Sequence, residues 1–468
     1  MRKLLLSGPI ALAALFVVSS VAIIAQTPTP TPASTVSVKG KTPVIIIPGF
    51  TGSELVNSKT GEEVWFKPRR SHDDDLQLPI SANLARNRDN LVPGDIIRSV
   101  KLFKFLPESE IYERLINTLE ARGGYKEGSF KNPPRDGFQD TFYVFPYDWR
   151  RDNVENARLL VRELDRLRRS LGKPNLKFNV VAHSMGGMIA RYAAMYGNAD
   201  LPRGNPVPTW AGAKYFDKIF LLGTPNEGSV QTLDVLLNGF SYIGGGINLP
   251  FIQNISRFDV FTIPAIYQLL PHNGSFRLYG EDLKPISADL YDPATWDKYD
   301  WSIWKDKDFT KKFTPLEQKN ARPYFVAVLA RAKRFEAALD APSIAKPPVS
   351  FYLMGADCKE TQNAAVVIFD KKKNEWRTIF KAESFTRDDG QKVADTELKA
   401  ILFAMGDGVV TKESLSGGNS AETGPRVELS PVSELFQCEV HNKLVTNPEI
   451  QDKLLVLLAG APSGSHLP

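Results

Sequence analysis

The chain has 468 residues, of which 43% are hydrophobic and 24% are charged, and its formal net charge is +5. A chain of this length and composition can bury a large core, which excludes an intrinsically disordered protein. Part of the positive charge comes from Arg2 and Lys3 in a targeting-like segment. The rest is close to balanced, so nothing indicates a nucleic-acid partner.

The N-terminus has the pattern of an export signal. Arg2 and Lys3 precede an apolar stretch over residues 4–25, and a Thr/Pro-rich segment follows. We predict a signal peptide over residues 1–25 and a linker over residues 26–40, and therefore a secreted, periplasmic or cell-surface protein. The alternative is an uncleaved anchor, because about 20 apolar residues can span a bilayer.

The remainder alternates between short apolar runs and helical patterns. Runs that end at Pro or Gly predict strands buried on both faces of a sheet, at 44–47, 142–145, 178–181, 219–222 and 349–354. Helices are predicted at 111–119, at 154–171 with Asp152 and Glu155 as a capping box, and at 448–458 with Asn447 as cap. We therefore predict an α/β fold with a mainly parallel sheet over residues 41–460, and a tail at 461–468.

Two stretches interrupt this alternation. Residues from about 52 to 107 are polar and without regular periodicity, and residues from about 226 to 348 are rich in aromatic side chains. Segments of this length between strands are usually lids or inserted subdomains. The aromatic insertion suggests a moving cover over an apolar substrate, although most of its aromatic residues are expected to form a core of their own.

The sequence Ala182-His183-Ser184-Met185-Gly186 lies between a predicted strand and a predicted helix. Small residues two positions either side of a serine allow the sharp turn of a nucleophile elbow. Ala182 stands where the usual pattern has glycine. We predict that Ser184 is a nucleophile; the alternative is a chance match at a helix start.

A serine nucleophile needs a histidine as base and a carboxylate to orient that histidine. Of the five histidines, His441 lies after the last predicted strand, whereas His183 should point away from the serine hydroxyl. Asp407, between two glycines, lies between serine and histidine in the chain, which is the order in α/β-hydrolases. Asp388 and Asp389 compete for this role, but their surroundings suggest an exposed turn.

An oxyanion needs two N–H donors. We expect the backbone N–H groups of Met185, directly after the serine, and of Phe50, in the loop after the first strand. No pattern for a metal or nucleotide site is found, so no cofactor is predicted. The run 72–75 (HDDD) could bind a cation, but an acidic solvated loop is the favoured interpretation.

The chain has two cysteines, Cys358 and Cys438. An even number in an exported protein makes them a candidate disulfide pair, although two buried thiols are the alternative. Cys438 lies three residues before His441, so a bridge would tether the histidine loop.

These residues resemble the lecithin:cholesterol acyltransferase family, which also contains lysosomal phospholipase A2 and phospholipid:diacylglycerol acyltransferases. The matching segments are 43–55 (PVIIIPGFTGSEL), 145–150 (FPYDWR), 180–187 (VVAHSMGG), 222–229 (LGTPNEGS), 266–271 (IYQLLP), 406–410 (GDGVV) and 441–444 (HNKL). They occur in family order over nearly the whole chain after the linker.

The resemblance implies an α/β-hydrolase fold with a lid and a membrane-binding segment, which would include residues 52–107. It implies a triad of Ser184, Asp407 and His441, an oxyanion hole at Phe50 and Met185, and a disulfide between the two cysteines. The expected function is a serine hydrolase or O-acyltransferase acting on lipid esters, in peripheral contact with a membrane or lipid surface. The lid region lacks the family's cysteine pair, so lipid preference does not carry over. The alternative is a catalytically silent lipid-binding or envelope protein.

Overall fold

The computed structural model describes residues 40–66, 76–100, 109–134, 139–241, 254–344, 346–418, 427 and 429–460. The predicted signal peptide and tail lie outside these residues, as do the acidic run 72–75 and all of the predicted linker except residue 40. Within the described part of the chain, no helix is both long enough and apolar enough to cross a membrane.

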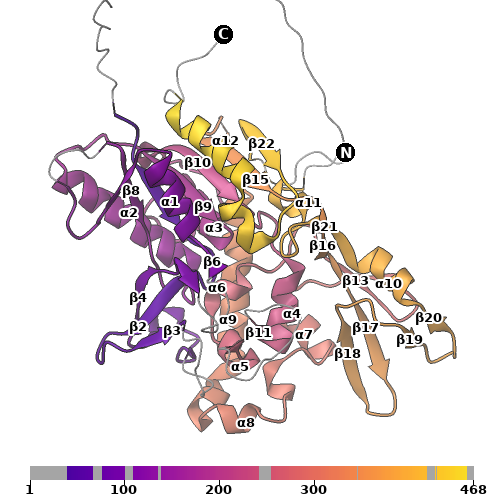
Figure 1. The fold of residues 1–468 in the computed structure, drawn as a ribbon. Helices are drawn as coiled ribbons and strands as arrows, with labels where there is room; N and C mark the ends of the chain where they lie inside the picture. Colours follow the sequence, from indigo (N-terminus) through magenta and orange to yellow (C-terminus); the bar gives the residue numbers. More distant parts are fainter. Residues whose placement is uncertain are drawn as a thin grey trace, which may run out of the picture. The chain divides into compact units, whose positions relative to one another are not determined.

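A parallel sheet of seven strands forms the centre of the fold (Figure 1). Its order is β22-β15-β10-β9-β1-β8-β7. The strands span Val44–Ile47 (β1), Lys126–Gly128 (β7), Thr141–Val144 (β8), Phe178–His183 (β9), Phe216–Leu222 (β10), Ser350–Gly355 (β15) and Ser433–Phe436 (β22). All five predicted strands are present, and the α/β prediction is confirmed. The two edge strands were missed because they are short and carry polar residues, so they lack a continuous apolar run.

Side chains of the central strands alternate between two cores. Ile45 and Ile47 of β1 pack with helices α2 (Asn153–Ser170) and α3 (Met185–Tyr196), whereas Val44 and Ile46 pack with α1 (Glu113–Ala121) and α12 (Pro448–Ala459). Helices therefore cover both faces of the sheet (Figure 1). This arrangement explains why the strands read as uninterrupted apolar runs.

Helix α2 begins at a cap that differs in part from the prediction. Asp152 accepts a hydrogen bond from the Glu155 backbone N–H at 3.1 Å, as expected. The Glu155 side chain does not close a capping box, because its carboxylate pairs with Arg151 and Arg88. Arg151, directly before the cap residue, thus binds the Glu155 carboxylate in place of the Asp152 backbone N–H.

The segment after β1 is more regular than predicted. Strands β2 (Ser53–Asn57), β3 (Glu63–Trp65) and β4 (Leu91–Ile96) form an antiparallel sheet in the order β3-β2-β4, with the short elements η1 (Leu84–Arg86), β5 (Ser99–Val100) and β6 (Ser109–Glu110) nearby in the chain. Trp65 is buried, and its Nε1–H donates to the Thr51 carbonyl at 2.9 Å. The expectation of an irregular stretch was wrong for these residues, since strands of only three to six residues, with register shifts in both of their pairings, give little periodic signal.

The insertion after β10 packs onto the main domain. Its elements are α4 (Val230–Asn238), β11 (Phe240–Ser241), β12 (Asn254–Ile255), α5 (Arg257–Phe261), α6 (Pro264–Tyr267), β13 (Arg277–Tyr279), β14 (Pro285–Ile286), α7 (Pro293–Lys298), η3 (Ile303–Lys305), α8 (Phe309–Lys312) and α9 (Pro315–Leu339). Phe261, Trp296 and Phe325 are buried in the same cluster that covers one face of the sheet. The aromatic residues therefore do form a core, but it is continuous with the central one.

A second insertion follows β16 (Lys359–Gln362). It comprises β17 (Ala364–Asp370), β18 (Glu375–Ile379), β19 (Phe385–Thr386), β20 (Lys392–Val393) and α10 (Asp395–Leu402), and it ends at β21 (Phe403–Gly406), which pairs with β16. Strand β17 pairs with β13 of the first insertion. Helix α10 ends at Leu402, and the strand before Asp407 begins at the next residue, Phe403.

Candidate active site

Ser184 lies at the sharp turn between β9 and α3, with φ 54° and ψ −128°. Such a backbone conformation is costly for a non-glycine residue and persists only where neighbours enforce it. Its N–H donates to the Leu222 carbonyl at 2.8 Å. A Cβ at Gly186 would lie 2.5 Å from the Pro48 carbonyl oxygen, so only glycine fits there. Ala182 is fully buried within β9, where its methyl group packs in the core.

His441 connects Ser184 to Asp407. Its Nε2 lies 2.9 Å from Ser184 Oγ, and its Nδ1 lies 2.7 Å from Asp407 Oδ2. We assign the ring proton to Nδ1, which donates to the carboxylate and leaves Nε2 to accept the serine proton. The side chains of His441 and Asp407 are 12% and 2% exposed. This arrangement can remove a proton from the serine hydroxyl and return it to a leaving group.

The Asp407 carboxylate is held by backbone groups of its own turn. Its Oδ1 accepts from the N–H groups of Val409 at 2.9 Å and Val410 at 2.7 Å, so Oδ2 faces the imidazole. The backbone N–H of His441 donates to the backbone carbonyl of Asp407 at 2.9 Å. The two competing aspartates lie elsewhere: Asp388 pairs with Lys371, and Asp389 accepts from the Gln391 N–H in a turn.

The loop that leads to Phe50 lies against the serine. A Cβ at Gly49 would lie 2.8 Å from Ser184 Cβ, so the loop that carries Phe50 passes directly over the nucleophile. Among the described residues, no acceptor is recorded for the Phe50 N–H. Met185 is the first residue of α3, so its N–H has no acceptor within the helix. Strands β1 and β9 are neighbours, and this is the place where ligands bind in open α/β sheets.

His183 has a role that we did not predict. Its Nε2 lies 3.1 Å from the His441 carbonyl, and its Nδ1 lies 2.9 Å from Tyr112 Oη, which accepts from the Gly49 N–H. Burial, together with the neighbouring His441, lowers the pKa of His183 to about 3. The neutral ring thus joins the base to the loop that carries Phe50. A histidine directly before the nucleophile was the only available signal, and we had noted only that it points away from the hydroxyl.

Cys358 and Cys438 form a disulfide with their Cα atoms 5.3 Å apart. Cys358 lies between β15 and β16, and Cys438 lies between β22 and His441. The bridge therefore joins the segment that leads into β16 to the segment that carries His441. Strand β16 pairs with β21, and Asp407 directly follows β21.

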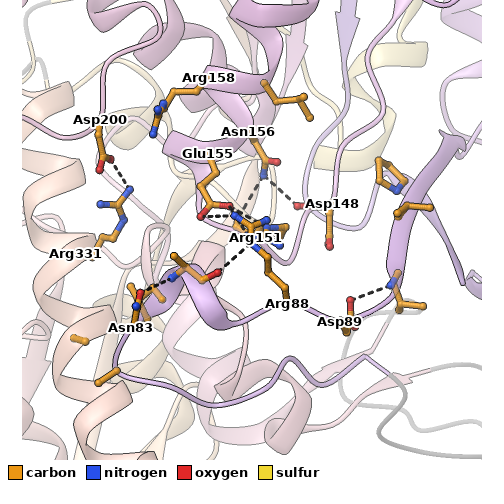
Figure 2. A pocket seen from close by; sticks show the side chains of 18 of the residues that line it. Asn83, Arg88, Asp89, Asp148, Arg151, Glu155, Asn156, Arg158, Asp200 and Arg331 are labelled. Carbon is orange, nitrogen blue, oxygen red and sulfur yellow. Dashed lines mark hydrogen bonds and ion pairs between the residues drawn. The ribbon is translucent and has the colours of Figure 1, made fainter. Parts of the chain in front are cut away.

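A cavity of about 1050 Å³ lies between α2, α9 and the η1 region (Figure 2). Its charged lining is largely paired: Arg331 donates to Asp200, and Arg151 donates to Glu155. None of the residues around Ser184 described above lines this cavity. It is therefore separate from the serine site.

Comparisons with known proteins agree with these features. The family model for lecithin:cholesterol acyltransferase matches residues 107–322, which include Ser184. Lecithin-cholesterol acyltransferase-like 4 of Arabidopsis thaliana is 23% identical over 253 residues, which are 49% of this chain and 42% of that protein. The chain thus spans less than half the length of this curated relative.

Two solved structures are also similar. The Tle4–Tli4 complex matches with 15% identity and a TM-score of 0.50, covering 89% of this chain and 98% of that chain. Bacillus licheniformis lipase BlEst2 in its mature form matches with 11% identity and a TM-score of 0.33, covering 90% and 94%. At these identities the first match indicates a shared fold, and the second is too weak to add to the argument.

Proposed function

We propose that the chain is a lecithin:cholesterol acyltransferase-like serine acyl hydrolase or O-acyltransferase that acts on lipid esters. The observation that carries this proposal is the hydrogen-bonded series Ser184–His441–Asp407. We expect the N–H groups of Phe50 and Met185 to complete the site. The family match supports an ester of a phospholipid or acylglycerol as substrate.

In the proposed reaction, Ser184 Oγ attacks the ester carbonyl while His441 Nε2 accepts its proton. Asp407 stabilises the resulting imidazolium and holds the ring in place. The Phe50 and Met185 N–H groups donate to the oxyanion, and each such donor contributes about two to three orders of magnitude in rate. His441 then protonates the leaving alcohol. Water or a second alcohol takes the acyl group from the serine.

A fluorophosphonate probe tests this proposal against a silent lipid-binding protein with the same fold. We expect one labelled site per chain, at Ser184, and no label on Ser184→Ala. Asp389→Asn, a change in the exposed turn, serves as the matched control and should label like the parent protein. Absence of label on the parent protein, or equal label on Ser184→Ala, would refute a serine enzyme.

The acyl acceptor is identified by incubating the protein with phospholipid vesicles, with and without an alcohol. Free fatty acid in both samples identifies a hydrolase, and a new ester in the second identifies a transferase. If neither free fatty acid nor a new ester forms, the protein does not act on phospholipid. The same assay with acylglycerol emulsions then tests the other substrate class.

We propose further that the protein is exported. The basic and apolar N-terminus supports this, as does the Cys358–Cys438 disulfide, because disulfides persist in oxidising compartments. Mass spectrometry of the secreted protein should find an N-terminus at Gln26. A membrane-bound product that retains residues 1–25 would instead indicate an anchor.

A further inference from the structure

Three potential metal ligands meet at the C-terminal end of α9, the last helix of the first insertion. Glu336 and Asp340 are four residues apart, so they lie on one side of the helix end. His272, from the loop after α6, faces them: its Nε2 lies 3.0 Å from Asp340 Oδ2 and 3.6 Å from Glu336 Oε2. One donor atom from each residue lies within 4.8 Å of the others.

The cluster is buried and lacks hydrogen bonds where they would be expected. Glu336 is 2% exposed, and neither of its carboxylate oxygens receives a hydrogen bond from the described residues. His272 Nε2 is buried beside the same carboxylates and already faces Asp340 Oδ2 at 3.0 Å, so the atoms that lack a donor are those of Glu336. A buried carboxylate without a donor is strongly unfavourable, and a cation between these atoms would satisfy it.

The geometry suits a tetrahedral ion. Nitrogen and oxygen ligands at about 2.0–2.2 Å from Zn²⁺ are separated from each other by about 3.4 Å, and the two distances from His272 Nε2 bracket this value. His272 Nδ1 faces the Leu270 carbonyl at 3.4 Å, which directs the Nε2 lone pair at the carboxylates. Asn273 Nδ2 donates to Asp340 Oδ2 at 2.7 Å and so orients the second ligand.

The charge of a divalent cation would offset that of the two carboxylates, with a neutral imidazole as the third ligand. The buried Arg191, which interacts electrostatically with both carboxylates, directs its hydrogen bonds to Asn226 Oδ1 and the Leu339 carbonyl. The Asp340 side chain is 15% exposed, which gives an ion a route in and leaves space for a water ligand.

We propose that His272, Glu336 and Asp340 bind one divalent transition-metal ion of the Zn²⁺ class. An imidazole with only two carboxylates favours Zn²⁺ over Ca²⁺ or Mg²⁺, which take oxygen ligands. The ion fastens the end of α9 to the loop that carries His272. That loop contacts the segment after β10, because the His272 backbone N–H and Ser275 Oγ–H donate to the Glu227 carbonyl.

We had predicted no metal, because 64 residues separate His272 from Glu336 and no local motif marks the pair.

Calorimetric titration of Zn²⁺ into chelator-treated, dialysed full-length protein tests the proposal. We expect one ion per chain and a raised melting temperature, with no saturable binding of Ca²⁺ or Mg²⁺. Replacing Zn²⁺ by Co²⁺ should give the visible absorption of a four-coordinate site. None of these measurements depends on esterase activity, so their failure would leave the proposed function untouched.

His272→Ala and Glu336→Gln should each weaken Zn²⁺ binding by at least about 10–100-fold, the usual effect of losing even a supporting residue. Asp289→Asn is the matched control. Asp289 is a more exposed carboxylate, and it pairs with Lys333 of α9 and not with the proposed ligands. Far-UV circular dichroism verifies that each variant folds, and the nearly isosteric Glu336→Gln decides the result if His272→Ala does not fold. No saturable Zn²⁺ binding by the parent protein, or equal binding by both ligand variants, would overturn the proposal.

Discussion

At Ser184, the position of one hydroxyl depends on hydrogen bonds made by other residues. His441 reaches the serine through Nε2 only because Asp407 binds its Nδ1, and Asp407 presents Oδ2 only because two backbone N–H groups bind Oδ1. Each interaction fixes the orientation of the next side chain. The site is therefore sensitive to changes that preserve shape but alter a donor or acceptor.

Asp407→Asn tests this dependence. The amide keeps the size of the carboxylate but favours the wrong tautomer of His441, so we expect kcat to fall by about 10⁴-fold while the melting temperature changes little. Steady-state kinetics with a chromogenic ester measure the effect. Asp389→Asn should retain full activity; a similar loss in both variants would show that Asp407 is not the orienting acid.

His183 predicts a dependence of stability on pH. Its pKa lies near 3 in the folded protein, below the ordinary value of 6.5, so between these values the unfolded chain binds a proton that the folded chain does not. The free energy of unfolding should therefore decrease as pH falls through this range, by up to about 1.4 kcal/mol per pH unit from this group. Urea unfolding at several pH values should give a shallower slope for His183→Gln. Parallel slopes would contradict the assignment.

At the scale of elements, the elbow depends on the close approach of β1, β9 and α3. Gly186 lets the first turn of α3 pass the end of β1, and Ala182 remains within β9, where a methyl group fits the core. Positions 182 and 186 both lie two residues from the serine, but only position 186 lies against the backbone of β1. This difference explains why alanine is tolerated at one of them.

Gly186→Ala should therefore be more harmful than Ala182→Gly. The new methyl group would lie 2.5 Å from a backbone oxygen of Pro48, which cannot move without displacing the Phe50 loop. We expect a loss of about 1–3 kcal/mol in the free energy of unfolding, together with most of the activity. Ala182→Gly should cost about 0.5–1 kcal/mol and leave kcat nearly unchanged. Thermal unfolding and ester kinetics of both variants provide the comparison.

At the scale of the whole domain, segments far apart in sequence contribute to one site. The first insertion shares its core with the sheet, and the disulfide joins two segments separated by 80 residues. Backbone hydrogen bonds and hydrophobic packing hold the strands, whereas the segments that carry Asp407 and His441 lie outside the sheet, where a covalent link adds restraint.

Removal of this link should affect both stability and catalysis. We expect Cys358→Ser combined with Cys438→Ser to lower the free energy of unfolding by about 2–4 kcal/mol, because the unfolded chain gains freedom. The activity should also decrease, as His441 loses a nearby tether. Adding reductant to the parent protein should reproduce both effects, and an unchanged melting temperature would argue against the bridge.

The sequence by itself determined the five central strands of the parallel sheet, the elbow and the order of the candidate residues. Buried parallel strands leave continuous apolar runs, and the tight turn at Ser184 requires small neighbours, so both leave local signals. The tertiary structure decided what depends on distant partners: the small sheet around Trp65, the use of Glu155 in ion pairs, and the contact of His183 with His441. It also brought His272 to Glu336. Such contacts follow from how elements pack, and neighbouring residues in the sequence carry no periodic or motif signal for them.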